Sequence, residues 1–506
     1  MVSTRRAIGA LCLLLCSCTT AQTILATCDE LGEAIIVNDA GSMEFQMDEN
    51  FECTGSTMSI GSGDVTIEGR GYSMKIGETF SPSDGSDIGG SLFANENGGT
   101  LTLRNIVFID AGAVSTVSPL NIRAVRNEGA LVVEGCTFLK LNQGVEGTGE
   151  YGGAIYTAGV NNDDSVAVTI RGSLFESNVA TVAGGAIFAT GSDAVTVEDS
   201  VFKMNEAANE DNQIAMGGGI FADSMVPLTV TNSSFSSNTA ESAGSAIYLC
   251  GGNLVHSTFM RHETFGDVDG ESYGAVTSKN NLGEGEGCEP LIVSNCSFNS
   301  NSLSGGIGGA LAVFNGELEV MDTDFESNQG GAVYFSSSNG DGRDTIEMVN
   351  CGFLYNTAPF LQLEDDRMLG TAVLVENTYE DGLSVEMGTF DTIACFRNKP
   401  YECEWVEHQI ESMHLGPFTC NACTKDGVSL VFKDDSIGGD DGGDDDNLRS
   451  VTPGDSSSDT SSGVVVGLAV ALGFVLVAVV ALGAWKIRVK RRSRRLLDGL
   501  NYDDNL

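Results

Sequence analysis

Two short motifs alternate along most of this chain, and they limit its fold more than any other feature. The first is a Gly-Gly-Ala-apolar block, such as GGAIF starting at Gly184. The second ends in Phe-x-x-Asn, such as FKMN from Phe202 to Asn205. Successive copies of the Phe lie 24 to 39 residues apart. The shortest distance is from Phe235 to Phe259, and the longest is from Phe259 to Phe298. A repeat of this length is one structural unit that buries its apolar side only by stacking on its neighbours.

A short run before each Phe alternates apolar residues with other residues, as in VTVEDSVF and LTVTNSSF. A period of two residues is typical of a β-strand. The repeat is too short for a βαβ unit with a full helix, but it fits a coil of three short strands and three turns. We therefore predict an all-β fold, a single-stranded right-handed parallel β-helix (a solenoid). Nine or ten coils would give a length of about 45 Å at about 4.8 Å per coil.

In such a stack, equivalent residues of successive coils lie on top of one another, so each motif position predicts a ladder. The Phe positions predict a buried aromatic ladder, and the Asn positions predict amide-to-amide hydrogen bonds along a turn. The glycines suit a tight corner with positive φ. His262 takes an Asn position, and we expect it to serve the turn. The predicted structural ladders are Phe175, Phe202, Phe235, Phe298, Phe325, Phe353, Asn178, Asn205, Asn238, Asn301, Asn328 and Asn356.

The ectodomain cysteines form two groups. Cys136, Cys296 and Cys351 each precede a Phe by two residues, and we predict buried free thiols because the last two are too far apart for a disulfide. The other eight are disulfide candidates, and the last four of them (Cys395, Cys403, Cys420 and Cys423) are expected to make two bridges. Zinc binding by these four is an alternative that the spacing and an oxidising exterior disfavour. The candidates are Cys28, Cys53, Cys250, Cys288, Cys395, Cys403, Cys420 and Cys423.

The two ends of the chain predict its compartment. An apolar run after Arg5 and Arg6 is typical of a secretory signal. Residues 463–485 are uncharged and long enough to span a bilayer, and the basic residues after them favour a cytoplasmic tail. We therefore predict a single-pass type I protein of the plasma membrane. Its predicted parts are a signal peptide (1–21), an N-terminal cap (22–60), β-helix repeats (61–393), a Cys-containing C-terminal cap (394–433), an acidic Gly/Ser/Asp-rich stalk (434–462), a transmembrane helix (463–485) and a basic cytoplasmic tail (486–506).

The formal net charge of −44 excludes most nucleic-acid partners, because the surface repels phosphate. Weak calcium binding by the acidic surface is an open alternative, and no other cofactor is expected. Asn232 and Asn295 begin glycosylation sequons and are expected to face outward. Gly463 and Gly467 form a small-xxx-small pair that is a candidate for homodimer contact between membrane helices.

The GGA[ILV] and Phe-x-x-Asn blocks over roughly residues 130–375 resemble the repeats of chlamydial polymorphic outer membrane proteins, within the pectate-lyase-like β-helix class. The resemblance implies the β-helix fold and adhesion at the cell surface. The C-terminus differs, because that family ends in an outer-membrane β-barrel, whereas this chain ends in one apolar segment and a basic tail.

No catalytic, cofactor-binding or metal-ligating set of residues is predicted. The basic residues that we identified within the coils share no position in the repeat, and no paired-Asp cleavage motif is present. Our first hypothesis is therefore a non-enzymatic surface protein for adhesion or for recognition of a glycan or protein ligand. The alternatives are a polysaccharide-active enzyme (lyase, epimerase or glycosidase) and a structural wall or matrix component. We expect specificity in the segments that do not recur, at 157–165, 206–216 and 262–290.

Overall fold

The computed structural model describes residues 23–357 apart from short segments, and beyond them the backbone of strands up to Ser429. The chain divides into two units, residues 1–436 and 437–506, and every described residue lies in the first. The predicted signal peptide, stalk, transmembrane helix and cytoplasmic tail therefore lie outside the described residues. The internal segments outside the description are 26, 37–40, 78–79, 81–89, 97, 111–121, 143–150, 160–165, 192–193, 209–214, 224–225, 266–272, 280–287, 304–307 and 338–344.

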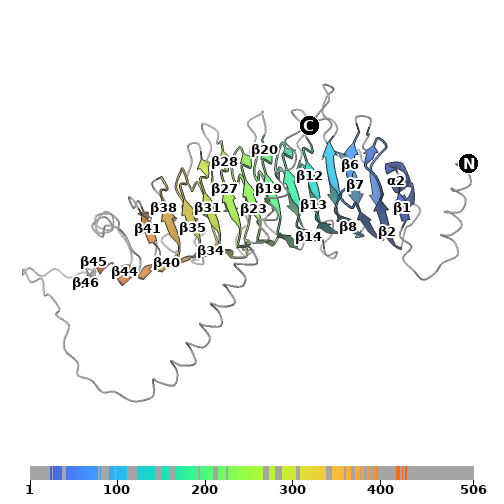
Figure 1. Ribbon diagram of the computed structural model, residues 1–506. Coiled ribbons are helices and arrows are strands. Elements are labelled where there is room, and N and C mark those ends of the chain that lie inside the picture. Colours follow the sequence, from blue (N-terminus) through green and yellow to red (C-terminus); the bar gives the residue numbers. More distant parts are fainter. Residues whose placement is uncertain are drawn as a thin grey trace, which may run out of the picture. The chain divides into compact units, whose positions relative to one another are not determined.

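Three long parallel sheets, A, B and C, run the length of the described unit, and each coil adds one strand to each sheet in turn (Figure 1). Sheet A has 15 strands. They are β1 (Thr23–Leu25), β2 (Ser42–Met47), β5 (Asp64–Glu68), β8 (Thr100–Arg104), β11 (Ala130–Glu134), β14 (Ala167–Arg171), β18 (Ala194–Glu198), β22 (Leu228–Thr231), β26 (Gly252–Val255), β30 (Leu291–Ser294), β34 (Glu317–Met321), β37 (Thr345–Val349), β40 (Thr371–Val375), β43 (Thr392–Phe396) and β44 (Phe418–Asn421).

Sheet B carries the Phe of each Phe-x-x-Asn motif at the centre of a short strand, and it has 12 strands. They are β3 (Phe51–Cys53), β6 (Ser73–Ile76), β9 (Val107–Asp110), β12 (Thr137–Leu139), β15 (Leu174–Glu176), β19 (Val201–Lys203), β23 (Ser234–Ser236), β27 (Thr258–Met260), β31 (Ser297–Asn299), β35 (Asp324–Glu326), β38 (Gly352–Leu354) and β41 (Thr378–Glu380).

Sheet C begins where each Gly-Gly-Ala block ends, and it also has 12 strands. They are β4 (Met58–Ile60), β7 (Gly90–Asn95), β10 (Ile122–Asn127), β13 (Ile155–Ala158), β17 (Ile187–Thr190), β21 (Ile220–Ala222), β25 (Ile247–Leu249), β29 (Val276–Lys279), β33 (Leu311–Phe314), β36 (Val333–Ser337), β39 (Leu361–Asp365) and β42 (Val385–Met387).

A fourth, short parallel sheet lies between sheets B and C in five coils. Its two-residue strands are too short to show a period in the sequence, which predicted only three strands per coil. An antiparallel pair, β45 (Thr424–Lys425) and β46 (Val428–Ser429), follows the stack along the chain. The strands of the short sheet are β16 (Val179–Ala180), β20 (Glu206–Ala207), β24 (Thr239–Ala240), β28 (Glu263–Thr264) and β32 (Ser302–Leu303).

The parallel sheets confirm the predicted all-β solenoid and are consistent with its right-handed winding. The stack is longer than the predicted nine or ten coils, because sheets B and C each have 12 strands. Strands of all three sheets already lie within residues 42–60, where the motifs are too degenerate to be recognised, and sheet A continues to Asn421.

Alternation along each strand forms the core. In β18, Val195 and Val197 are buried while Thr196 between them is half-buried on the outside. Burying side chains of this size contributes about 1.5–3 kcal/mol each. Neighbouring strands pair without a shift, for example Val195 with Leu228, so apolar residues continue from coil to coil.

Three corners of most coils have a positive φ, and at the corner directly after sheet B the residue type varies, as at Ser177 (φ 56°) and Met204 (φ 53°). Between sheets A and B this position is Gly, Asn, Asp or His, as at Asp199 (φ 50°) and Asn232 (φ 50°), and Asn and Asp tolerate this region best after Gly. Before sheet C it is the first Gly of the Gly-Gly block, as at Gly184 (φ 68°). A Cβ on the following Gly185 would collide with the carbonyl oxygen of Gly218 in the next coil, so the second glycine is needed for close coil stacking.

The helix α2 (Cys28–Ile36) contacts the first strands of the stack, at the N-terminal end of the described unit (Figure 1). The Thr27 hydroxyl caps it by accepting a hydrogen bond from the Glu30 N–H at 3.1 Å. Leu31 and Ile35 on one face are buried in the core, and the Cys28–Cys53 disulfide links the helix to β3. The helix thereby covers apolar residues that an open end would expose.

Candidate functional site

The Phe residues of the repeat stack inside sheet B from Phe108 to Phe353, with ring centroids 4.6 to 5.2 Å apart. Every ring in this ladder is at most 2% exposed. Phe108 and Phe138 extend the ladder two coils before Phe175, and Phe259 continues it through the coil that lacks the Asn. These side chains hold the coils together and are not available to a ligand.

The Asn residues form a buried ladder at the turn after sheet B. The Asn178 Nδ2 donates to Asn205 Oδ1 at 2.9 Å, and Asn205 Nδ2 donates to Asn238 Oδ1 at 2.9 Å. Asn301, Asn328 and Asn356 continue the pattern at 2.9 and 2.8 Å. Each Nδ2 also donates to the carbonyl of a Phe in the preceding coil. The amides thus satisfy buried backbone groups at every turn.

His262 takes one rung of this Asn ladder and is 1% exposed. The His262 Nδ1 accepts a hydrogen bond from the backbone N–H of Asn238 at 3.2 Å. The backbone N–H of His262 donates to Asn301 Oδ1 at 3.1 Å. Its Nε2 is buried without a hydrogen-bond partner. Burial lowers the pKa of His262 from 6.5 to about 4, so the imidazole is neutral near pH 7.

A further buried ladder of Ser, Thr and Cys lies at the corner between sheets A and B. The Ser200 Oγ donates to the Glu198 carbonyl at 2.8 Å and accepts from the Ser173 N–H at 3.1 Å. Cys136, Cys296 and Cys351 occupy the same position as buried free thiols, as predicted. Desolvation raises their pKa values to about 12, 11 and 12, and a protonated thiol is a poor nucleophile and metal ligand. These cysteines are structural.

A second aromatic row lies on the outer side of sheet C, one residue after the buried Ile of the Gly-Gly-Ala block. Tyr156, Phe188, Phe221 and Tyr248 stack with centroids 5.4, 5.0 and 5.0 Å apart. Small and apolar residues before the Gly-Gly pairs, such as Ala183, pack against this row. The alternation in GGAIF and GSAIY could have revealed it, because a residue next to a buried Ile must face outward. The row is mostly buried and offers no open aromatic face.

Charges alternate along one outer edge of sheet A, through Glu68, Arg104, Glu134, Arg171 and Glu198. Arg104 Nε lies 2.8 Å from Glu134 Oε2, and Arg171 Nε lies 2.8 Å from Glu198 Oε2. The hydrogen bond to Glu198 raises the pKa of Arg171. These charges neutralise one another, which leaves them ill-suited to bind a charged substrate.

The outer side of sheet B changes character along the stack. From β6 to β19 its outward side chains are mainly apolar or basic, and Val201 is 38% exposed. Glu176 is the acidic exception within this region, and its Oε1 lies 2.9 Å from Lys203 Nζ. We call this region the basic-apolar patch, and it comprises Lys75, Val107, Ile109, Thr137, Leu139, Lys140, Leu174, Val201 and Lys203.

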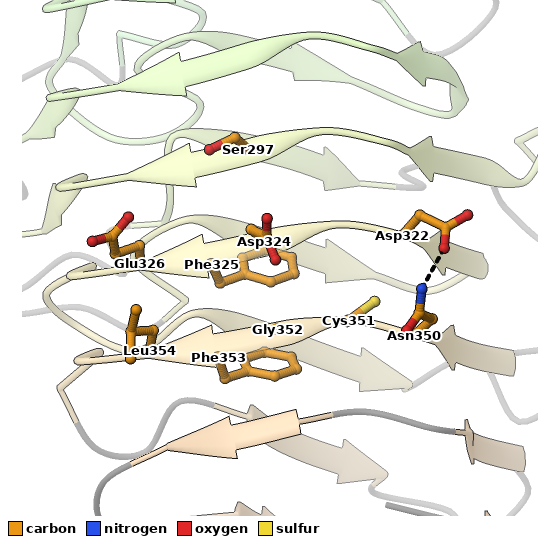
Figure 2. Close-up of a pocket in the computed structure, with 10 residues that line it drawn as sticks. All are labelled: Ser297, Asp322, Asp324, Phe325, Glu326, Asn350, Cys351, Gly352, Phe353 and Leu354. Atoms are coloured by element: carbon orange, nitrogen blue, oxygen red, sulfur yellow. Dashed lines mark hydrogen bonds between the residues drawn. The ribbon is translucent and has the colours of Figure 1, made fainter. Parts of the chain in front are cut away.

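An acidic hollow of about 540 Å³ lies further along the same side, over β31, β35 and β38 (Figure 2). Asp324 and Glu326 extend from β35, and Asp322 accepts a hydrogen bond from Asn350 Nδ2 at 2.6 Å. A Cβ on Gly352 would lie 2.6 Å from Asp324 Oδ1, so the glycine keeps the floor open. The hollow is lined by Ser297, Asp322, Asp324, Phe325, Glu326, Asn350, Cys351, Gly352, Phe353 and Leu354.

The remaining candidate residues are scattered. The structure pairs Cys250 with Cys288 as well as Cys28 with Cys53. Cys395 and Cys420 are register partners in β43 and β44, and their side chains lie outside the description, as do Cys403 and Cys423. Asn232 and Asn295 of the sequons are exposed at the corner between sheets A and B. The three variable segments, 157–165, 206–216 and 262–290, include short strands and connecting residues, and parts of each (160–165, 209–214, 266–272 and 280–287) lie outside the description.

Among the described residues, no group of three or more His, Cys, Asp or Glu side chains is placed to hold a metal ion. In the same part of the chain, no helix has the length and apolar character needed to span a bilayer. The acidic hollow and the basic-apolar patch are two open surfaces of the described residues.

One comparison identifies the repeat. Residues 172–190 match the Chlamydia polymorphic membrane protein repeat. The matched segment runs from the corner before β15 to the end of β17, so it contains both FESN and GGAIF. The membrane protein repeat and the stacked parallel sheets agree on the β-helix. No curated protein and no solved structure matches the chain.

Proposed function

We propose that this chain is a non-enzymatic cell-surface protein whose β-helix binds a glycan or protein ligand through the outer side of sheet B. The observation that carries the proposal is the contrast within single three-residue strands. The central Phe is buried in every coil from β9 to β38, whereas the outer residues differ from coil to coil and form the acidic hollow. A volume of about 540 Å³ lies within the range of small-molecule sites.

The surface location in this proposal is supported by the membrane protein repeat and by the chain ends. A single span at 463–485, followed by basic residues, would place the β-helix outside a plasma membrane as a type I protein. Gly463 and Gly467 are the proposed contact between two spans. The net charge of −44 supports a partner other than nucleic acid.

The test is a glycan and protein binding screen with the ectodomain, residues 22–432. Ligands found should bind at least about tenfold more weakly to the Asp324→Asn/Glu326→Gln variant, because hydrogen bonds to charged groups contribute about 1.5–3 kcal/mol. Glu347→Gln on the outer side of sheet A is the matched control and should bind normally. Ligands that bind the hollow variant and the wild type equally would place recognition elsewhere.

The alternative of a polysaccharide-active enzyme has one specific observation in its favour. Asp324 and Glu326 line the same hollow, and glycosidases use two carboxylates as acid and base or nucleophile. Incubating the ectodomain with neutral and acidic polysaccharides tests it. Turnover that disappears in Asp324→Asn would replace the binding proposal with an enzymatic one.

A further inference from the structure

The outer side of sheet B carries basic residues near one end and acidic residues near the other. Two copies placed in opposite directions would therefore bring opposite charges together. The first part of this outer side, the basic-apolar patch, carries Lys75, Lys140 and Lys203, of which Lys203 is paired with Glu176, whereas its last part, the acidic hollow, carries Asp324 and Glu326. The full chain is strongly acidic, so a partly basic and apolar surface is unusual for it. The apolar side chains of this patch are half-buried, apart from the exposed Val201, and an apolar surface bordered by charged residues is typical of an interaction site.

Two strands lie between these regions: β27, with Thr258 and the exposed Met260 followed by Arg261, and β23, which is neutral and small. In β23 the outward residues are Ser234 and Ser236. Sheet B runs in the order β9, β12, β15, β19, β23, β27, β31, β35, β38. Therefore β12 lies three strands before β23 and β35 lies three strands after it. Likewise β9 lies four strands before it and β38 four after it.

We propose that two copies of this chain pack antiparallel through the outer sides of sheet B, around a two-fold axis at β23. The basic-apolar patch of each copy then lies on the acidic hollow of the other. Strand β12, with Leu139 followed by Lys140, faces β35 with Asp324 and Glu326. Strand β9 faces β38, so the apolar side chains of β9 meet Leu354. A two-fold contact of this kind uses the same surface on both copies.

The size of this surface predicts a weak contact. Nine strands at about 4.8 Å give a length of about 40 Å, and three residues give a width of about 10 Å. Two copies would bury about 800 Å² in total, less than the roughly 1,200 Å² of most stable interfaces. Charge complementarity mainly sets the partner and its orientation. Many copies on one surface would strengthen the contact by avidity.

The antiparallel direction of the two copies determines where their C-terminal ends lie. The N-terminal helix α2 lies at one end of the stack, and the last strands of sheet B lie at the other (Figure 1). Two antiparallel copies therefore have their C-terminal ends at opposite ends of the pair. With the C-terminal membrane anchor of the proposed function, on which this inference rests, the two copies would come from opposing membranes. The partner is then a second copy on a neighbouring cell.

The test uses the full chain, tagged at its N-terminus after the signal peptide, on suspension cells that do not aggregate by themselves. Wild-type cells should form clusters. Cells with Lys140→Glu alone, or with Asp324→Lys alone, should cluster at least about tenfold less, because each symmetric dimer then has two like-charge contacts. Mixed in equal numbers, the two variant populations should cluster with each other, since both contacts regain opposite charges.

Glu347→Lys, the same type of charge change on the outer side of sheet A, is the matched control and should cluster like the wild type. The inference is overturned if wild-type cells at normal surface density stay single, if the single variants cluster normally, or if mixing restores nothing. If the ectodomain binds a ligand but cells do not cluster, self-association is refuted and the proposed function is not.

If tag staining finds no chain on the surface, the proposed anchor fails. The charge exchange is then measured on the detergent-solubilised full chain by sedimentation over a range of concentrations. Dimers in the wild type and in the mixture, but not in either variant, would support the interface. Monomers throughout would overturn it.

Discussion

The inner and outer sides of sheet B belong to the same three-residue strands, yet they differ completely. On the inner side, Phe recurs in every coil from Phe108 to Phe353 and its rings stack about one strand spacing apart. On the outer side, the neighbouring residues change from Val107 to Ser234 to Asp324. The inside must fit identical neighbours above and below, whereas the outside meets solvent or a partner. Recurrence in this chain therefore marks the scaffold, and variation marks the surface where recognition is expected.

Replacing an inner ring should have the largest effect. Phe235→Ala removes a fully buried ring between Phe202 and Phe259, and we expect the free energy of unfolding to fall by about 3–5 kcal/mol. Ser236→Ala on the outer side of the same strand should change it by less than about 0.5 kcal/mol. Urea denaturation followed by circular dichroism measures both. Equal effects of the two changes would refute the contrast between the two sides.

The His rung should make the inner side sensitive to acid. Burial lowers the pKa of His262 to about 4, so between pH 6.5 and 4 the unfolded chain binds a proton that the folded chain does not. Stability from this group is complete above pH 6.5, falls as the pH drops, and levels off below about 4. The total loss is about 3 kcal/mol at about 1.4 kcal/mol per unit.

His262→Asn should remove this part of the acid sensitivity by restoring the amide ladder. The exposed His256 provides the matched control, and His256→Asn should leave the pH profile of unfolding as it is in the wild type. Denaturation midpoints at several pH values between 4 and 7 measure the effect. A His262→Asn profile with the wild-type slope would show that the histidine is not the acid-sensitive rung.

Removing an ordinary rung should cost somewhat less. In Asn205→Ala, the Phe175 carbonyl and the Asn178 N–H lose a buried partner, and an unsatisfied buried polar group costs about 1–3 kcal/mol. Asn253→Ala, on the outer side of sheet A, should be close to neutral. The same denaturation assay compares them, and a neutral Asn205→Ala would mean that water replaces the rung.

The outer charge ladder should matter least. Arg104 is about half exposed and pairs with Glu134, and an exposed ion pair contributes about 0.2–1 kcal/mol. Arg104→Ala should lower the free energy of unfolding by this amount in low salt and by less in 1 M NaCl, where charges are screened. A loss as large as that of the inner ring would show that the outer side also carries the fold.

The sequence by itself determined the solenoid and the inner ladders. Phe175, Asn178 and Ile187 occupy positions set by a period of two residues and by fixed spacing within a motif, so their stacking follows once the coils are parallel. It also indicated that Cys136, Cys296 and Cys351 are buried thiols. The degenerate first coils and the two-residue strands were missed, because neither leaves a period long enough to recognise.

Only the tertiary structure decided which outer side chains form an open surface. Gly352 forms the floor beside Asp324, and Leu139 of the basic-apolar patch lies beside Glu176, although the loops between coils differ in length. The motif aligns these strands, but the sequence does not show which aligned outer side chains leave an open surface. The hollow, the basic-apolar patch and the unpartnered Nε2 of His262 depend on the packing of side chains on the hydrogen-bonded parallel strands.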